Sequence, residues 1–303
     1  MNLSAPGPKG RDLPSTRTQA EGFKVHPEPR LAAPSSKAKL RAVEWVDFRV
    51  TAIGAAAGLF FFYGGLLLSL FFFLGPSDLR GVLADPNTLF SIRLSLLTAT
   101  VATFFAVAVG LPAAYALSRF KFAGKRILDT FLEIPMIISP IALGAALLVF
   151  FNTPLGEIIQ EKGLYFVFEV PGIILAQFAS IAGLATRLMK ASLDEISPRY
   201  ESVGRSLGLS AWQAFYKVTL PLSLRGLIAS AIISWAKAIG EFGATVTLAG
   251  SMSGKTETLP IAIFLALGSA DINKAIVLIL FLSVLGLCTL YGVRLTGKRF
   301  RYD

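Results

Sequence analysis

Residues 187–226 read RLMKASLDEISPRYESVGRSLGLSAWQAFYKVTLPLSLRG, a polar stretch between two strongly apolar segments. Ser197 and the proline after it can begin a short helix, and Gly208 can end that helix in a left-handed conformation. Ser210 can cap a second helix, AWQAFYKV, and Pro221 is expected to close the segment. The stretch therefore predicts a helix–glycine–helix elbow, which is longer and more structured than an ordinary connection.

Apolar residues dominate the chain on both sides of the elbow. Hydrophobic residues make up 54% of the 303 residues and the mean hydropathy is +0.64, a balance that soluble domains of this length rarely reach. Six apolar segments are each near the roughly 20 residues needed to cross a bilayer. They are residues 50–74, 90–117, 128–151, 170–189, 224–249 and 272–295. The sequence thus predicts an all-α membrane protein with six transmembrane helices.

The basic residues of the connections support this count and give an orientation. Lys and Arg are concentrated before the first span, after the second, after the fourth and after the sixth, and the other connections are poorer in them. Because cytoplasmic loops carry the excess of Lys and Arg, this alternation predicts that both termini lie in the cytoplasm. The net charge of +10 is therefore expected for a multi-pass protein of the cell membrane and implies no nucleic-acid partner.

The chain divides into a tail and a membrane domain. Residues 1–44 are rich in Pro, Ser, Ala and basic residues and have no periodic apolar face, so we expect a disordered basic tail in the cytoplasm. Residues 45–303 would form the six-span domain, in which residues 190–222 make the connection that contains the elbow.

Two charged residues interrupt the fifth apolar segment. Lys237 and Glu241 are four residues apart, so they would share one helix face near the middle of the span. A charge at that depth costs at least about 2.5–3.5 kcal/mol and normally faces a bundle interior or a water-filled path. Two interpretations remain open: the pair neutralises itself and braces neighbouring helices, or it lines a path or gate.

Other polar or small residues in spans three to five are further candidates for a path or gate. Pro135 and Pro140 free backbone carbonyls in the third span, and broken helices of this kind often line transport paths. The candidates besides the charged pair are Glu133, Ser139, Gln177, Gly243 and Thr245.

The segment AGSMSGKT, residues 249–256, nearly matches a phosphate-binding loop. That motif needs a preceding strand and a following helix, whereas here a membrane span precedes it and Pro260 is expected to interrupt the next segment. We therefore expect an extracytoplasmic connector, and no nucleotide site in this chain.

The elbow resembles the corresponding loop in permease subunits of ABC importers. The signature of that loop is Glu-Ala-Ala, three residues, Gly, nine residues and Ile-x-Leu-Pro. Gly208 and the run Val218-Thr219-Leu220-Pro221 reproduce its second half at the correct spacing. In the first half Ser202-Val203-Gly204 replace Glu-Ala-Ala, and Glu201 stands one position early.

Two further runs are similar to the molybdate/tungstate branch of that family. They are WAKAIGEFGATVTLAG at residues 235–250 and KTETLPIAIF at residues 255–264. The sulfate and thiosulfate permeases are close relatives of this branch, so sulfate stays open as an alternative substrate. A carrier driven by an ion gradient and a membrane-embedded enzyme also remain as hypotheses, although we see no internal repeat and no nucleophile–base pair in the spans.

The resemblance implies a type I ABC importer permease that performs no covalent chemistry. It implies a homodimer in the lipid membrane, two ABC ATPase subunits that bind ATP in the cytoplasm, and an oxyanion-binding protein outside. The elbow, residues 195–220, would be the coupling helix seated on an ATPase. The residues that the resemblance assigns to this coupling are Glu195, Arg199, Glu201, Ser202, Gly208, Leu209, Ser210, Leu220 and Pro221.

Overall fold

The computed structural model describes the backbone of residues 36–298 and the side chains of residues 49–75 and 79–292. Every regular element in this described part is a helix, which confirms the predicted all-α class. The chain forms two units, residues 1–62 and 63–303. Helix α1 (Ser36–Phe71) begins inside the segment expected to be disordered, and the rest of that segment, residues 1–35, lies outside the described residues.

Five helices in the described part are long and apolar enough to cross a membrane, and one bent helix pair can make a sixth span. The elements that follow α1, in chain order, are α2 (Pro76–Ala84), α3 (Pro86–Arg119), α4 (Lys125–Phe131), α5 (Ile134–Ile137), α6 (Pro140–Phe151), α7 (Pro154–Glu161), α8 (Val170–Asp194), α9 (Arg199–Ser206), α10 (Ala211–Ala214), the π-helical turn η1 (Phe215–Thr219), α11 (Leu220–Ile239), α12 (Gly243–Ala249), α13 (Leu259–Gly268) and α14 (Ile272–Lys298).

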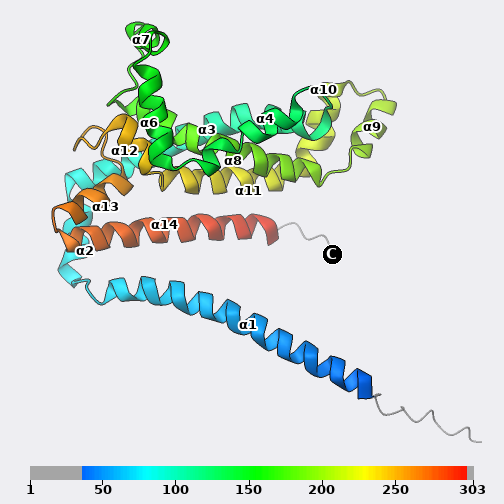
Figure 1. The fold of residues 1–303 in the computed structure, drawn as a ribbon, viewed down its shortest axis with the longest axis horizontal. Helices are drawn as coiled ribbons and strands as arrows, with labels where there is room; N and C mark the ends of the chain where they lie inside the picture. The colour runs from blue at the N-terminus through cyan, green and yellow to red at the C-terminus, as the bar shows by residue number, and fades with distance from the viewer. Residues whose placement is uncertain (1–35, 299–303) are drawn as a thin grey trace, which may run out of the picture. The chain divides into compact units, whose positions relative to one another are not determined.

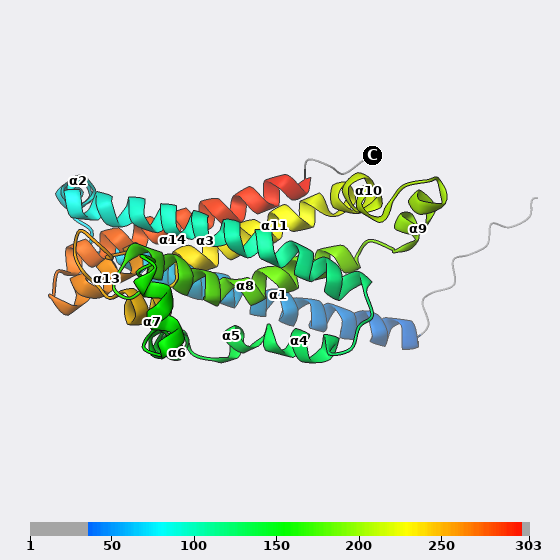
Figure 2. The same ribbon diagram turned by 90° about the horizontal axis from the view of Figure 1, so that it is seen from above.

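The centre of the second unit is built from α3, α8 and α11, which run side by side, with α14 against α11 (Figure 1, Figure 2). Small residues make this close packing possible. Ala99, Ala106 and Ala185 are fully buried between the helices. A Cβ atom on Gly110 of α3 would lie only 2.7 Å from the Met189 side chain of α8. Small residues at such contacts are typical of helix packing in membranes, where van der Waals contact drives association.

The third predicted span is broken, as its two prolines predict. The segment Lys125–Ile137, which contains α4 and α5, meets α6 at an angle of 110°. Pro140 lies in the first turn of α6, and the Ser139 hydroxyl accepts a hydrogen bond from the Ala142 N–H at 3.2 Å. Ser139 therefore acts as the cap that starts a helix in a new direction.

The fifth predicted span, residues 224–249, is not one helix. Helix α11 ends at Ile239, and the short helix α12 begins at Gly243 after a break. At the other end, α10, η1 and α11 run together from Ala211 to Ile239, so the span begins inside the elbow. The apolar character of residues 240–249 led to the wrong boundary, because hydropathy does not report backbone breaks.

Pro221 does not close the elbow as predicted. It lies in the first turn of α11, directly after η1. Proline has no N–H and its ring clashes with the carbonyl four residues earlier, whereas the wider π-helical turn moves that carbonyl away. The second half of the elbow is therefore continuous with the membrane helix α11.

Pro260 also begins a helix where an interruption was predicted. It stands in the first turn of α13, a position that proline favours. Leu259, Ile261 and Ala262 of α13 are buried, so this ten-residue helix is part of the packed unit and not a simple connector.

Candidate coupling elbow and intramembrane polar site

The turn at the centre of the elbow has the predicted glycine geometry. Gly208 has φ +93°, a left-handed conformation. The N–H of Leu209 donates to the Gly204 carbonyl at 3.1 Å, and the N–H of Gly208 donates to the Arg205 carbonyl at 3.0 Å. These two bonds form the Schellman motif that ends α9. The predicted role of Gly208 as a helix terminator is confirmed.

The second half of the elbow begins with a complete capping box. The Ser210 hydroxyl accepts from the Gln213 N–H at 3.2 Å, and the Gln213 side chain accepts from the Ser210 N–H at 2.9 Å. This reciprocal pair fixes the direction in which the chain enters α10. The predicted cap is confirmed.

Large apolar and aromatic side chains project from the elbow. Leu207 is 81% exposed and Trp212 is 71% exposed. The Trp212 ring stacks on Tyr216 with centroids 5.7 Å apart. Further exposed side chains of the same segment are Tyr200 and Val203. Clustered exposed aromatic residues are characteristic of protein contact surfaces, since they bury a large area at small entropic cost.

The residues predicted to couple the elbow to an ATPase fall into an exposed group and a partly buried group. The exposed group is Glu195, Arg199, Ser202, Gly208, Ser210 and Pro221. Leu209, Leu220 and Glu201 are partly buried, and Leu220 packs against the core between α3, α8 and α11. The predicted set therefore contains both surface residues and residues that hold the elbow together.

Glu201 is the centre of a hydrogen-bonded group that sequence reasoning missed. One carboxylate oxygen, Oε1, accepts from Arg119 Nε at 2.9 Å and from the Thr219 hydroxyl at 2.6 Å. The other, Oε2, accepts from the Tyr115 hydroxyl at 3.0 Å. The Arg119 side chain is 6% exposed and the Glu201 side chain 14%. Its partners are distant in sequence, so no local signal points to this group.

The charge state of Glu201 follows from these contacts. Burial alone would raise the pKa of the Glu201 carboxyl. The hydrogen bonds from Thr219, Arg119 and Tyr115, with the charge of Arg119, outweigh burial, and the pKa lies below its ordinary value of 4.5. Glu201 is therefore ionised at neutral pH.

Lys237 and Glu241 remain paired, but they do not share the face of one helix, because Lys237 lies in the last turn of α11 and Glu241 lies in the break that follows it. Lys237 Nζ lies 3.5 Å from Glu241 Oε2. The Glu241 side chain is 1% exposed, and its Oε1 accepts from the Ala244 N–H at 3.1 Å. Glu241 thus holds the first turn of α12, where a carboxylate is favourable. The Lys237 side chain is 49% exposed, so the two charges have different surroundings.

Helices α6 and α12 cross at very close range beside this pair. A Cβ atom on Gly144 would lie 2.7 Å from the Ala244 carbonyl oxygen, and one on Gly243 would lie 2.9 Å from the Ile141 nitrogen. Only glycine allows this approach. The broken third and fifth spans therefore meet at the polar site.

Glu133 lies apart from the Lys237 pair and has a different partner. Its carboxylate pairs with the Arg187 guanidinium of α8 at 2.5 Å, and both side chains are partly exposed. This contact fastens the start of α5 to α8. Glu133 was predicted as a path candidate from the sequence, but its pairing with Arg187 was not predicted.

Buried polar atoms without a hydrogen-bond partner gather on the helices around the break. Gln177 of α8 is fully buried, and both polar atoms of its amide are unpartnered, as is the Thr245 hydroxyl of α12. Ala176 and Ala244, their chain neighbours, belong to one core cluster. Such unpaired groups are costly, and a polar solute or water can satisfy them. Gln177 and Thr245 are thus fully buried polar residues, and their role in a path stays a prediction.

A second buried polar group precedes α13 and was not predicted. Thr256, Glu257 and Thr258 are almost fully buried. The Ser95 hydroxyl of α3 accepts from the Leu259 N–H at 2.6 Å, and Ser91 donates to Glu257 at 3.4 Å. The three- and four-residue spacing of Ser91, Ser95 and Thr98 along α3 is the sequence signal that could have revealed this polar helix face.

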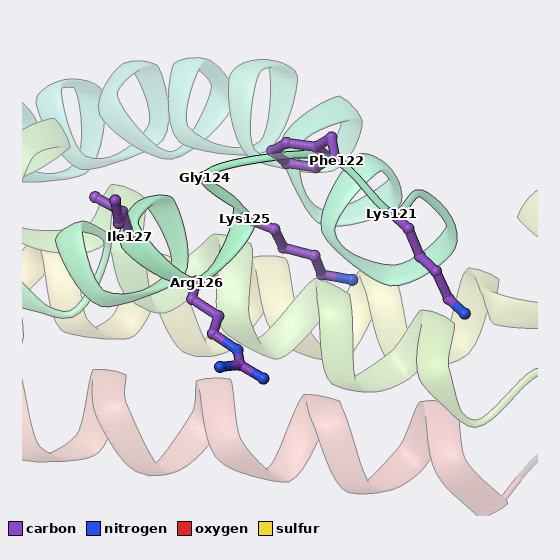
Figure 3. A pocket seen from close by; sticks show the side chains of 6 residues that line it. All are labelled: Lys121, Phe122, Gly124, Lys125, Arg126 and Ile127. Atoms are coloured by element: carbon purple, nitrogen blue, oxygen red, sulfur yellow. The ribbon is translucent and has the colours of Figure 1, made fainter.

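A pocket of about 430 Å³ lies on the basic connection between α3 and α4 (Figure 3). It is lined by Lys121, Phe122, Gly124, Lys125, Arg126 and Ile127. In Figure 3 the charged ends of the three basic side chains lie toward the lower side of the view, and Phe122 and Ile127 lie above them. The pocket contains none of the predicted path residues.

Comparison with known proteins gives a family and a set of relatives. A family model described as "Binding-protein-dependent transport system inner membrane component" matches residues 106–302. The molybdenum transport system permease protein ModB of Escherichia coli (strain K12) is 33% identical over 186 residues, which are 60% of this chain and 81% of that protein. The sulfate transport system permease protein CysW of the same strain is 32% identical over 232 residues, which are 74% of this chain and 78% of that protein.

Solved structures show the same fold at lower identity. A bacterial alginate ABC transporter, in complex with an alginate pentasaccharide-bound periplasmic protein, matches with a TM-score of 0.68 and 17% identity over 86% of this chain and 96% of that chain. The MetNI methionine ABC transporter in an inward-facing conformation matches with a TM-score of 0.55 and 19% identity, over 70% of this chain and 95% of that chain. The predicted fold of an ABC importer permease is therefore confirmed.

Proposed function

This chain belongs to the family of binding-protein-dependent transport system inner membrane components, and on that premise we propose that it forms the path by which an ATP-driven importer moves a tetrahedral oxyanion into the cell. The chain is a multi-pass membrane subunit and performs no covalent chemistry. Family membership decides against the gradient-driven carrier and the membrane-embedded enzyme.

The proposed substrate is molybdate or tungstate. The molybdenum permease and the sulfate permease of Escherichia coli have nearly equal identity to this chain, at 33% and 32%. Similarity therefore supports an oxyanion and gives molybdate a small preference. Sulfate is the second candidate, and it is favoured by the longer match to the sulfate permease.

The proposed assembly follows the implications of the family. Two copies of this chain would face each other in the lipid membrane, with both termini in the cytoplasm. Each copy would bind an ATPase subunit through the exposed side chains of its elbow, among them Leu207 and Trp212. An extracytoplasmic binding protein would deliver the anion, as the periplasmic protein bound to the alginate transporter suggests.

The single observation that carries the proposed path is the half-exposed Lys237 at the break in the fifth span. A doubly charged oxyanion needs a cation and hydrogen-bond donors where the dielectric constant is low. An unshielded cation would hold the anion too tightly for release. Because Glu241 partly neutralises Lys237, the site suits brief contact. Closure of the ATPases on ATP would draw the two elbows together and move α8 and α11, which alternately opens the path to each side.

Uptake by a Lys237→Ala variant tests this proposal. We expect ATP-driven uptake of radioactive molybdate by cells or proteoliposomes to fall about tenfold or more, because a charge-assisted hydrogen bond contributes roughly 1.5–3 kcal/mol. The Lys237→Arg variant should retain part of the uptake, and the ATPase should still co-purify with both variants.

Lys162→Ala is the matched control, since Lys162 is an exposed lysine of the connection after α7. Its uptake should equal that of the unmodified chain. Normal uptake by Lys237→Ala would show that the path does not depend on this cation.

A further inference from the structure

We infer that Glu201, Arg119, Tyr115 and Thr219 form an internal clamp that joins the elbow to α3, so that α3 moves with the elbow when an ATPase pulls on it. This inference rests on the proposed function of the elbow as the coupling element. It assigns Glu201 a positioning role inside the chain, in place of the expected contact with the ATPase.

The contacts of the clamp connect three separate parts of the chain. Tyr115 and Arg119 lie on the last turns of α3, Glu201 lies in the first turn of α9, and Thr219 is the last residue of η1. All three donors reach the same carboxylate, at 3.0, 2.9 and 2.6 Å. The clamp thus fixes both halves of the elbow to the end of α3.

Arg119 extends the clamp to the end of α8. Its Nη2 donates to the Leu193 carbonyl at 3.0 Å and to the Ile196 carbonyl at 2.8 Å. The guanidinium is therefore almost fully buried and engaged on two sides. A buried ion pair of this kind is sensitive to the loss of one partner, because the remaining charge is left without compensation.

Connectivity explains why α3 needs such a clamp. The elbow follows α8 directly, and η1 continues directly into α11, so the chain itself transmits movement to these two helices. Helix α3 continues instead to α4, and five further helices separate it from the elbow along the chain. Side-chain contacts must therefore transmit the movement to α3. They are the packing of α3 against α8 and α11, the hydrogen bond from Ser118 to Asp194, and the clamp, which contributes an ion pair.

The clamp also leaves Glu201 little capacity for an external partner. Both carboxylate oxygens already accept hydrogen bonds within the chain, and the side chain is mostly buried. An ATPase would meet the elbow through the exposed apolar and aromatic side chains. The residues that dock the ATPase are thus different from the residues that transmit its movement to α3, although both groups belong to the elbow.

Three substitutions test the clamp in the complete transporter with its ATPase and binding protein. Glu201→Gln removes the charge, Tyr115→Phe removes one donor, and Thr219→Val removes another while keeping the side-chain shape. The complexes are reconstituted in proteoliposomes with molybdate, or with sulfate if the unmodified complex imports only sulfate. The measurements are the amount of ATPase that co-purifies and the ratio of anion imported to ATP hydrolysed.

We expect all three variants to retain the ATPase. The ratio of import to hydrolysis should fall about two- to thirtyfold for Glu201→Gln, the range for residues that carry coupling between sites, and by less for the two hydroxyl variants. A purely structural role would lower the yield of complex but leave this ratio unchanged. Glu161→Gln and Tyr165→Phe, which alter exposed residues elsewhere, are the matched controls.

The inference is overturned if Glu201→Gln loses the ATPase while both hydroxyl variants behave normally, because Glu201 would then be a docking residue. It is also overturned if both hydroxyl variants keep the unmodified ratio, which covers the case in which Glu201→Gln does not fold. Failure of the proposed function is a different result, namely that the unmodified complex imports no oxyanion when ATP is supplied.

Discussion

At the scale of single residues, Lys237 and Glu241 differ in burial and therefore in the role that each can have in the polar site. Glu241 is buried and holds the first turn of α12, whereas Lys237 is half-exposed. The i, i+4 spacing predicts their pairing correctly. The break at residues 240–242 could not be placed from the sequence, because the glycines at 240 and 243 permit either a local bend or a close approach of helices. Of the two interpretations left open by the sequence, bracing suits Glu241, and contact with the anion is our proposal for Lys237.

Gly208 gives a prediction at the same scale. A Gly208→Val substitution forces a β-branched residue into a left-handed conformation, at a cost of about 1–2 kcal/mol. A Cβ atom there would meet no heavy atom within 4 Å, so the strain of the turn is the whole effect. We expect the elbow to shift and ATP-driven uptake to fall severalfold, measured in proteoliposomes.

Gly163 offers a matched control for Gly208. It has φ +88° and equally open surroundings, but it lies in the connection after α7. Gly163→Val should have a similar cost in thermal stability and leave the uptake per ATP hydrolysed unchanged. Equal losses of coupling in the two variants would argue against the elbow assignment.

At the scale of elements, the breaks in spans three and five are the features that build the site. Pro135 and Pro140 made the first break predictable, because a proline in a helix interior removes a backbone hydrogen bond and kinks or breaks the helix. The second break has no proline, and the crossing of α6 and α12 depends on glycines more than 90 residues apart, Gly144 and Gly243. Sequence periodicity reports what one helix can do alone, and it does not report which helices meet.

The crossing of α6 and α12 can be tested through Gly144. In a Gly144→Val variant the new side chain would overlap the Ala244 backbone, which lies 2.7–2.8 Å from the Cβ position. We expect a loss of about 1–3 kcal/mol in stability, typical of overpacking, together with loss of uptake. Thermal unfolding of the purified complex and transport by the same preparation measure the two effects.

Gly286→Val in α14 is the control, since a Cβ atom there meets nothing within 4 Å. It should unfold near the temperature of the unmodified protein and transport normally. If Gly144→Val does the same, the close crossing is not required for the site.

At the scale of the whole molecule, composition and charge alternation predicted the fold class and the approximate spans. Apolar runs and loop charges are properties of the sequence itself, and the bilayer imposes them directly. The contacts that organise the site are not visible as properties of the sequence itself. Glu201 lies 82 residues from Arg119, and Glu133 pairs with Arg187 of another helix, so neither pair has a signal in local spacing.

ATP-dependent accumulation of molybdate in proteoliposomes that contain this chain, its ATPase and its binding protein tests the central claim most directly. We predict accumulation that requires both ATP and the binding protein and that is reduced by excess tungstate. Accumulation that proceeds without ATP, or complete absence of import for molybdate, tungstate and sulfate alike, would contradict the assignment of this chain to an ATP-driven oxyanion importer.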